Sequence, residues 1–330
     1  MSISTLPASL DEKRLSGFDP AGELRRLVRS WIRSLRSRNR SERTITSYAE
    51  AVKMLDRFLS EQGMPRSVEN ITREHLEEFL NDQTERNSAA TALTRYHALR
   101  AFFRWLVEDA EELTRSPMEK MKPAKATEPE MRVLSIEEIA AILATCEKGK
   151  TLDDRRDYAI LSMLMHGGFR RNELAELELG DLDLDRAEVV IRHAKGGRPR
   201  VIRIEEAMPA LERYLRRREV HPKAKVRGIP EQKLWLGKMG PIKRGGVAFI
   251  VNRRVRQAGI TKPEEIHPHT FRHSYAHHWL ASGGSEGDLM KNMGWTSREM
   301  LQRYGSSMAG ERAREASSRF GVAALLRGRR

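Results

Sequence analysis

The sequence predicts a mainly α-helical protein of two domains, of which the second also contains a small antiparallel β-sheet. Apolar residues recur with helical spacing along most of the chain. Two β-branched runs, AEVVIRHA and RPRVIRIE, are joined by the turn-forming segment KGG, a pattern typical of a β-hairpin. A stretch rich in proline and lysine at residues 115–132 lacks apolar periodicity and separates the two halves.

The first half predicts a compact helical domain over residues 22–116. Residues 1–21 are polar and contain Pro7, Gly17 and Pro20, so we expect a flexible N-terminal lead. After it, side chains such as Leu24, Trp31 and Leu35 lie on one helical face. Serine and threonine residues precede the later apolar runs, as N-caps do. Helices are expected at residues 22–37, from Ser41, from Thr72, and from about Ser88 to Glu108.

A linker is predicted at residues 117–132, and a second domain at residues 133–312. Ser135 and Glu138 form a capping-box pattern before an apolar run, which indicates a helix start. The hairpin follows further on, and after Glu206 the pattern returns to helix. Residues 313–330 form a short tail whose apolar side chains cannot build a core of their own, so we expect it to dock on a neighbouring subunit.

Charge favours a polyanionic partner. The chain has 330 residues, and its 60 Lys and Arg minus 46 Asp and Glu give a net charge of +14. Basic side chains on DNA phosphates release condensed counterions, so this surplus favours a nucleic-acid partner over a merely basic surface. The single cysteine, Cys146, excludes a disulfide within the chain and a thiolate metal cluster. No signal peptide or membrane-spanning apolar run is evident, and we expect a cytoplasmic protein, associated with the nucleoid through DNA.

Four stretches carry residues with chemical potential, although each alone has an ordinary structural explanation. Arg170 follows a double glycine, and Lys195 lies at the tip of the predicted hairpin, where a charged turn residue is common. The stretch HPHTFRHSYAHH contains five histidines, of which three have i, i+4, i+8 spacing. Because zinc sites rarely take three such ligands from one helix, we expect no metal there. Tyr304, nine residues after Trp295, could be a packed aromatic.

Taken together and in this order, these stretches resemble the catalytic set of the tyrosine site-specific recombinases, the phage integrase family. GFRRNEL resembles the family's G-x-R-x-x-E-L box, which selects Arg170 and Glu173. AKGGRPR resembles the segment with the family's β-hairpin lysine, which selects Lys195. HPHTFRHSYAHHWL resembles the H-x-L-R-H box, which gives His269 and Arg272.

The last box departs from the family pattern at one position. NMGWTSREMLQRYG resembles the segment that ends in the nucleophile, which is Tyr304 here. Trp295 stands where the family usually has histidine; its indole N–H can donate a hydrogen bond but cannot exchange a proton as imidazole can. The resemblance covers about residues 22–310, with the first domain similar to the family's core-binding domain.

The resemblance implies metal- and ATP-independent cleavage and rejoining of duplex DNA through a 3′-phosphotyrosine intermediate, with no cofactor. In this mechanism Arg170 and Arg272 hold the phosphate, and Lys195 protonates the leaving 5′ oxygen. His269 either assists proton removal from Tyr304 or holds the phosphate. Glu173 orients another residue of the site, and Trp295 donates to the phosphate and packs the site. The expected partners are a double-stranded DNA attachment site and three further copies of this chain. The protein would be a monomer in solution and a tetramer on two duplexes.

We expect an integrase that inserts or excises a phage or mobile element. A chromosome-dimer resolvase or a transposon recombinase would use the same chemistry. A type IB topoisomerase is a further alternative, because it uses a similar set of catalytic residues. A DNA-binding regulator that retains an inactive form of the catalytic site is the non-enzymatic alternative. Only 21 residues precede the first expected helix, so we expect no additional arm-binding module. Candidate base-reading segments are residues 36–48, 85–98 and 240–256.

Overall fold

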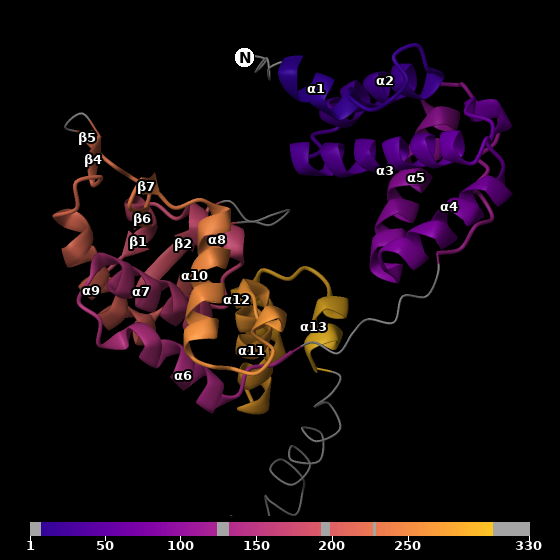
Figure 1. Cartoon of the computed structure of the whole chain (residues 1–330). Helices are drawn as coiled ribbons and strands as arrows, with labels where there is room; N and C mark the ends of the chain where they lie inside the picture. The colour runs from indigo at the N-terminus through magenta and orange to yellow at the C-terminus, as the bar shows by residue number, and fades with distance from the viewer. Residues whose placement is uncertain (1–7, 124–131, 193–198, 227–228, 306–330) are drawn as a thin grey trace, which may run out of the picture. The chain divides into compact units, whose positions relative to one another are not determined.

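The computed structural model describes residues 8–123, 132–192, 199–226 and 229–305, and the chain divides into two compact units, Met1–Pro129 and Glu130–Arg330 (Figure 1). The division falls inside the segment expected to be the linker. Among the described residues, no helix is both long and apolar enough to span a lipid bilayer.

The first unit is an all-helical bundle in the part of it that the structure describes. Its core is built around Trp31, whose ring stacks on Tyr48 with a centroid distance of 5.4 Å and lies 5.0 Å from the ring of Phe102. Ser41 and Ser88 accept hydrogen bonds from backbone N–H groups of the helices that they begin, as their positions predicted. The α-helices are α1 (Ala8–Leu15), α2 (Glu23–Ser37), α3 (Glu42–Glu61), α4 (Arg73–Arg86) and α5 (Ala89–Glu108).

The expected flexible lead is wrong for residues 8–18. α1 packs on α2 and α3, and Leu15 and Phe18 are buried in the core of the first unit. Ion pairs hold the short helix in place: both carboxylate oxygens of Asp11 accept from Arg36, each at 2.6 Å. An isolated helix of this length is unstable in water, so its tertiary contacts stabilise it. The same pairing shows that Arg36, in a candidate base-reading segment, already has a carboxylate partner.

The expected linker also begins too early. Met118 and Met121 are buried in the core of the first unit, and the hydroxyl of Tyr96 donates to the Met121 carbonyl at 2.6 Å. Two apolar side chains in a proline- and lysine-rich stretch give no periodicity, so their burial was not evident from the sequence. Residues 124–131 lie outside the described part of the chain.

The second unit packs helices around a core to which the three-stranded sheet β1-β2-β3 contributes. The predicted capping box of Ser135 and Glu138 begins α6, and the predicted hairpin is present, with Ile191 paired to Arg200. Cys146 is buried near the end of α6. The α-helices are α6 (Ile136–Glu147), α7 (Leu152–Gly167), α8 (Arg171–Glu176), α9 (Met208–Glu219), α10 (Arg244–Gln257), α11 (Pro268–Ala281), α12 (Glu286–Met293) and α13 (Arg298–Gly305). The sheet strands are β1 (Leu182–Asp183), β2 (Glu188–Ile191) and β3 (Arg200–Arg203).

The helical pattern expected after Glu206 is interrupted by two small antiparallel ribbons. One pairs β4 (Lys225–Val226) with β5 (Ile229–Pro230), and the other pairs β6 (Leu236–Gly237) with β7 (Gly240–Pro241). Strands of two residues are too short to leave an alternating apolar pattern, which explains why they were not predicted.

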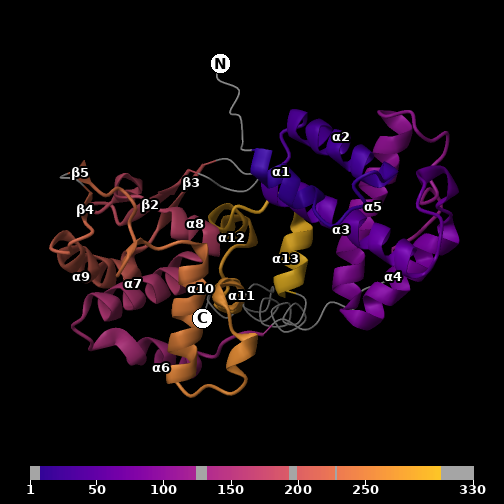
Figure 2. The ribbon, with the colours of Figure 1, turned by 45° about the horizontal axis from the view of Figure 1, so that its top comes forward.

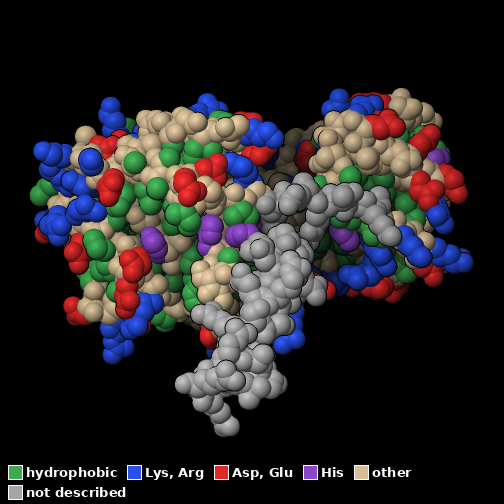
Figure 3. Space-filling model, turned by 90° about the horizontal axis from the view of Figure 1, so that it is seen from below, with side chains coloured by type: hydrophobic (Ala, Val, Ile, Leu, Met, Phe, Trp, Pro, Cys, Tyr) green, Lys and Arg blue, Asp and Glu red, His purple; other side chains and the backbone are tan. Residues whose placement is uncertain are grey.

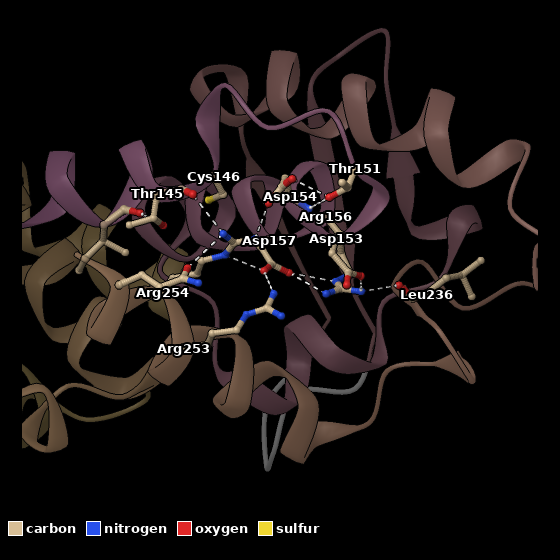
Figure 4. A network of polar contacts seen from close by, with 12 residues as sticks. Thr145, Cys146, Thr151, Asp153, Asp154, Arg156, Asp157, Leu236, Arg253 and Arg254 are labelled. Atoms are coloured by element: carbon tan, nitrogen blue, oxygen red, sulfur yellow. Dashed lines mark hydrogen bonds and ion pairs between the residues drawn. The ribbon is translucent and has the colours of Figure 1, made fainter. Parts of the chain in front are cut away.

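A buried ionic cluster joins α7 to α10 inside the second unit (Figure 4). The Asp157 side chain is fully buried, and its carboxylate accepts from Arg156 at 2.8 Å, from Arg254 at 2.8 Å and from Arg253. Arg254 also donates to the Thr145 carbonyl at 3.1 Å, which adds α6 to the cluster. The cluster therefore fixes the position of α10, one of the candidate DNA-facing segments.

Basic side chains are distributed over the surface. On the face shown in Figure 3, lysine and arginine side chains surround both units, with acidic side chains between them. The exposed side of α10 carries Phe249, whose relative exposure is 65%, together with Asn252 and Arg256. A surface of this kind suits a phosphate backbone because cations can be placed along it.

Candidate active site

The site is built where α7 ends, and its first residues are Arg170 and Glu173. Gly168 ends α7 in the left-handed conformation, with φ of +55°, and the chain turns into α8. Arg170 is the N-cap of α8: its backbone N–H donates to Glu173 Oε2 at 2.9 Å, and its Nη1 donates to Oε1 at 2.8 Å. Burial alone would raise the pKa of Glu173, but hydrogen bonds and charge from Arg200 and Arg170 hold it below its ordinary value.

Arg272 enters the same region from α11 and is almost completely buried, with 1% relative exposure. Its Nη1 donates to the Gly168 carbonyl, and its Nη2 donates to the Met293 carbonyl at 2.5 Å. The guanidinium also lies 5.7 Å from the ring centroid of Trp295, within the range of a cation–π contact. The arginine is thus fixed by α7, by the end of α12 and by an aromatic ring.

The turn at the end of α12 brings the arginines together. Gly294 ends this helix in the left-handed conformation with φ of +60°, and its carbonyl accepts from Arg170 Nη2 at 3.2 Å. The Met293 carbonyl accepts from Arg272, so two guanidiniums are attached to consecutive peptide units. The last carbonyls of a helix lack intrahelical partners and carry partial negative charge, which explains why cations gather there.

His269 lies in the first turn of α11 and is solvent-exposed. Desolvation by the surrounding protein lowers the pKa of His269, and the charges of Arg272, His267 and Arg170 lower it further. A lowered pKa favours the neutral imidazole, which is the form that can accept a proton.

Two other histidines of α11, His273 and His278, are partly buried. Burial is the largest cause that lowers the pKa of the half-buried His273, to about 4. His278 makes a ring-nitrogen contact of 2.8 Å with the Leu134 carbonyl. Within the described part of the chain, no group of three or more His, Cys, Asp or Glu residues is placed to hold a metal ion.

For two of the predicted site residues, Lys195 and Tyr304, the structure does not describe the side chain. Lys195 lies in residues 193–198, outside the described residues, between β2 and β3. The backbone of Tyr304 lies in the last turn of α13, and its side chain is not among the described parts of the structure. α13 packs beside α11 and α12, where Leu301, Leu289 and Trp295 share one apolar cluster (Figure 2). The helix that carries Tyr304 thus lies against the helix that carries His269 and Arg272.

The structure adds Arg200, which the sequence reasoning did not select. This residue of β3 donates from both terminal nitrogens to the Glu173 carboxylate, at 3.0 and 2.7 Å, and from Nε to the Asn292 carbonyl at 2.8 Å. The alternation in the run RVIR pairs Arg200 with Ile202 on one strand face and Arg203 with Val201 on the other, so the sequence left open which arginine points inward.

The described residues therefore bring together Arg170, Glu173, Arg272 and Trp295. His269 lies close enough for the charges of Arg170 and Arg272 to lower its pKa. Two guanidiniums that are held in one place match the geometry of a tetrahedral oxyanion such as a phosphate diester. A neutral imidazole beside them supplies a proton acceptor. The arrangement is suited to binding a phosphate group and to proton transfer next to it.

Comparison with protein families gives two matches that follow the two units. Residues 132–310 match the phage integrase family, and residues 27–112 match the phage integrase N-terminal SAM-like domain. Among curated relatives, tyrosine recombinase XerD of Halalkalibacterium halodurans is 30% identical over 276 residues, which cover 81% of this chain and 88% of that protein. Tyrosine recombinase XerC of Myxococcus xanthus is 29% identical over 267 residues, which cover 80% of this chain and 87% of that protein.

Solved structures share the fold at low identity. The Tn1549 transposon integrase, in complex with transposon right end DNA, is similar with a TM-score of 0.71 and 19% identity, covering 89% of this chain and 98% of that one. The XerH site-specific recombinase bound to a palindromic difH substrate has a TM-score of 0.68 and 19% identity, covering 93% of each chain.

Proposed function

Because this chain belongs to the phage integrase family, and is thus a tyrosine recombinase that breaks and rejoins DNA strands, we propose that Tyr304 is its nucleophile and that Arg170 and Arg272 hold the scissile phosphate. The observation that supports this most directly is the attachment of both arginines to the consecutive carbonyls of Met293 and Gly294. These contacts hold the two guanidiniums at neighbouring peptide units, and the planar fork of a guanidinium matches the geometry of phosphate oxygens.

The nucleophile needs this positive surrounding. The pKa of a tyrosine hydroxyl is near 10, so forming the phenolate at pH 7 costs about 4 kcal/mol. Nearby guanidiniums lower that cost, and they stabilise the additional negative charge of the pentavalent transition state. His269, whose pKa is lowered, accepts the phenolic proton as the oxygen of Tyr304 attacks phosphorus.

Cleavage then exchanges one phosphate ester for another. The bond between Tyr304 oxygen and phosphorus forms, the bond from phosphorus to the 5′ oxygen breaks, and Lys195 gives its proton to that oxygen. The 3′-phosphotyrosine ester retains the bond energy, so a 5′ hydroxyl from a second duplex reverses the step and joins new strands. Trp295 supports Arg272 by packing against its guanidinium.

DNA is the partner, and we propose that recombination is carried out by four copies of this chain on two duplexes. The substrate would be the attachment site of a phage or mobile element, in keeping with the fold shared with a transposon integrase. A chromosome-dimer resolvase also fits the family, and it would use the same residues on a different DNA sequence.

The assignment of the nucleophile is tested with a nicked duplex. The Tyr304→Phe variant is used to select binding sequences from a randomised duplex library, and the selected duplexes are nicked at successive positions. A nick near the scissile phosphate releases a short fragment and traps the covalent adduct. The wild-type protein should form this adduct in the presence of a chelator, and Tyr304→Phe should bind the duplex without forming it.

A matched control is Tyr158→Phe, because Tyr158 is a partly buried tyrosine of the same unit, on α7. It should form the adduct at the wild-type rate. An adduct with Tyr304→Phe, or none with the wild-type protein on DNA that it binds, would refute the proposal.

A further inference from the structure

Arg200 is a nearly buried arginine with two defined partners. Its side chain is 9% exposed and that of Glu173 is 2% exposed, and the two form a two-pronged ion pair. Its third contact is the Asn292 carbonyl. Arg200 therefore joins three segments that are far apart in the sequence: β3, the start of α8 and the end of α12.

The contacts of Arg200 complete a series at the end of α12. Three successive carbonyls accept hydrogen bonds from three different arginines: Asn292 from Arg200, Met293 from Arg272 and Gly294 from Arg170. Two of these arginines are the proposed phosphate ligands. The third holds the first carbonyl of the series and so fixes the turn to which the other two are attached.

Arg200 also controls the partner of Arg170. The Glu173 carboxylate is shared, since Oε1 accepts from Arg170 at 2.8 Å and from Arg200 at 3.0 Å, and Oε2 accepts from Arg200 at 2.7 Å. A buried carboxylate without sufficient partners is costly. If Arg200 were removed, Glu173 would retain Arg170 as its sole described cationic partner and would draw that guanidinium further onto itself.

We propose that Arg200 is a positioning residue for DNA cleavage: by saturating Glu173 and holding the Asn292 carbonyl, it keeps the Arg170 guanidinium directed at the scissile phosphate. Arg200 does not touch the phosphate itself. This inference rests on the proposed function, because it takes Arg170 to be a phosphate ligand.

The test compares Arg200→Met with Arg200→Lys and with the matched control Arg203→Met. Arg203 is on the same strand, but its side chain is 66% exposed and pairs only loosely with Glu205, at 3.5 Å. The rate of adduct formation on the nicked duplex, DNA affinity and thermal unfolding are measured for each full-length protein, and each rate is divided by the folded fraction.

Arg200→Met should form the adduct roughly 10²-fold more slowly than the wild-type protein, because a small displacement of a reacting group has an effect of this size. Its affinity for DNA should change by less than about threefold, since other cations supply most of the binding. Arg200→Lys should recover part of the rate, because it keeps the charge and loses the fork. Arg203→Met should react like the wild-type protein.

A substrate with a neutral scissile group distinguishes two explanations for a slow Arg200→Met variant: misplacement of the Arg170 guanidinium, or a general disruption of the structure. In a duplex with a methylphosphonate at the scissile position, one charged oxygen is replaced by a methyl group, so there is less charge for Arg170 to neutralise. The ratio of wild-type to Arg200→Met rates should then fall to within about threefold, since the arginine clamp contributes less to this transition state.

Two results would overturn the inference: an Arg200→Met rate equal to that of the wild-type protein on ordinary DNA, or an equal loss of rate on both substrates. Should Arg200→Met fail to fold, the same comparison is made with Arg200→Lys, for which a loss on ordinary DNA of less than about twofold would contradict the proposal. If the wild-type protein binds the duplex and forms no adduct, the proposed function fails instead, so the two failures are distinct.

Discussion

At the scale of single residues, the site depends on a glycine that no side chain can replace without strain. Gly294 has φ of +60°, and a Cβ at this position would lie 3.1 Å from Nη1 and 3.3 Å from Cδ of Arg200. Gly259 has a similar φ of +68°, but a Cβ there would meet nothing within 4 Å. A substitution at either glycine strains the backbone, but only a substitution at Gly294 also disturbs Arg200. Comparing the two therefore separates these two effects on stability and rate.

We predict that Gly294→Ala and Gly259→Ala each lower the free energy of unfolding by about 1–2 kcal/mol, the cost of a left-handed residue with a Cβ. Only Gly294→Ala should also slow adduct formation, by roughly tenfold or more, because its methyl group displaces Arg200 and the turn. Urea denaturation and the nicked-duplex assay measure the two effects. Equal adduct rates for the two variants would show that the turn tolerates the extra atom.

The residues of the candidate site were predictable from the sequence to different extents. Arg170, His269, Arg272 and Tyr304 stand in motifs whose order and spacing are recognisable in one chain. Arg200 was missed because RVIR offers an apolar and a charged residue to each face of the strand. Which face is buried depends on packing against other segments, and a shift of one residue would reverse it.

At the scale of secondary-structure elements, the helix caps were predictable and the docking of short elements was not. The caps at Ser41, Ser88 and Ser135 each satisfy the backbone N–H group three residues further on, so the information is local. The docking of α1 depends on Asp11 meeting Arg36, an interaction across 25 residues of sequence. Such a partner cannot be read from periodicity.

The position of the helix α10 is also set by tertiary contacts, and we predict that it depends on Asp157. The variant Asp157→Asn removes the buried charge that three arginines share, and breaking a buried ion pair typically costs about 3–5 kcal/mol. The free energy of unfolding, measured with urea on the full chain, should fall by about 3 kcal/mol. Affinity for DNA should fall as well if α10 faces the duplex.

The control is Glu212→Gln, which removes an exposed carboxylate, 51% accessible and 3.9 Å from Arg216. Exposed pairs of this kind contribute less than about 1 kcal/mol, so this variant should unfold like the wild-type protein. A similar small effect for Asp157→Asn would mean that the neighbouring acidic residues compensate for the lost charge.

At the scale of the whole molecule, the proposed tetramer requires a contact between subunits. The sequence of the tail, residues 313–330, lies outside the described residues and contains an apolar cluster. These side chains are Phe320, Val322, Ala323, Leu325 and Leu326. They are too few for a core of their own, so docking on a second copy of the chain would remove them from water.

We predict that deletion of residues 315–330 leaves binding of a single copy to one duplex intact and abolishes the assembly of two duplexes. Binding is measured by mobility shift, and the mass of the complex by analytical ultracentrifugation. Deletion of residues 2–7, at the opposite end and also outside the described residues, serves as the control and should assemble normally. Normal recombination by the shortened chain would show that the tail is not the subunit contact.

The sequence by itself determined the helical class, the two-part organisation, the hairpin and the order of the residues that the family uses for its chemistry. Periodicity, caps and motif spacing are properties of neighbouring residues, and a single chain displays them. Only the tertiary structure decided that Arg200 shares Glu173 with Arg170 and that three arginines meet at the carbonyls of residues 292–294. Arg200 lies 27 residues from Glu173 and 92 from Asn292 along the chain. The partner of a guanidinium is set by which segments the folded core brings together, and local sequence does not encode that.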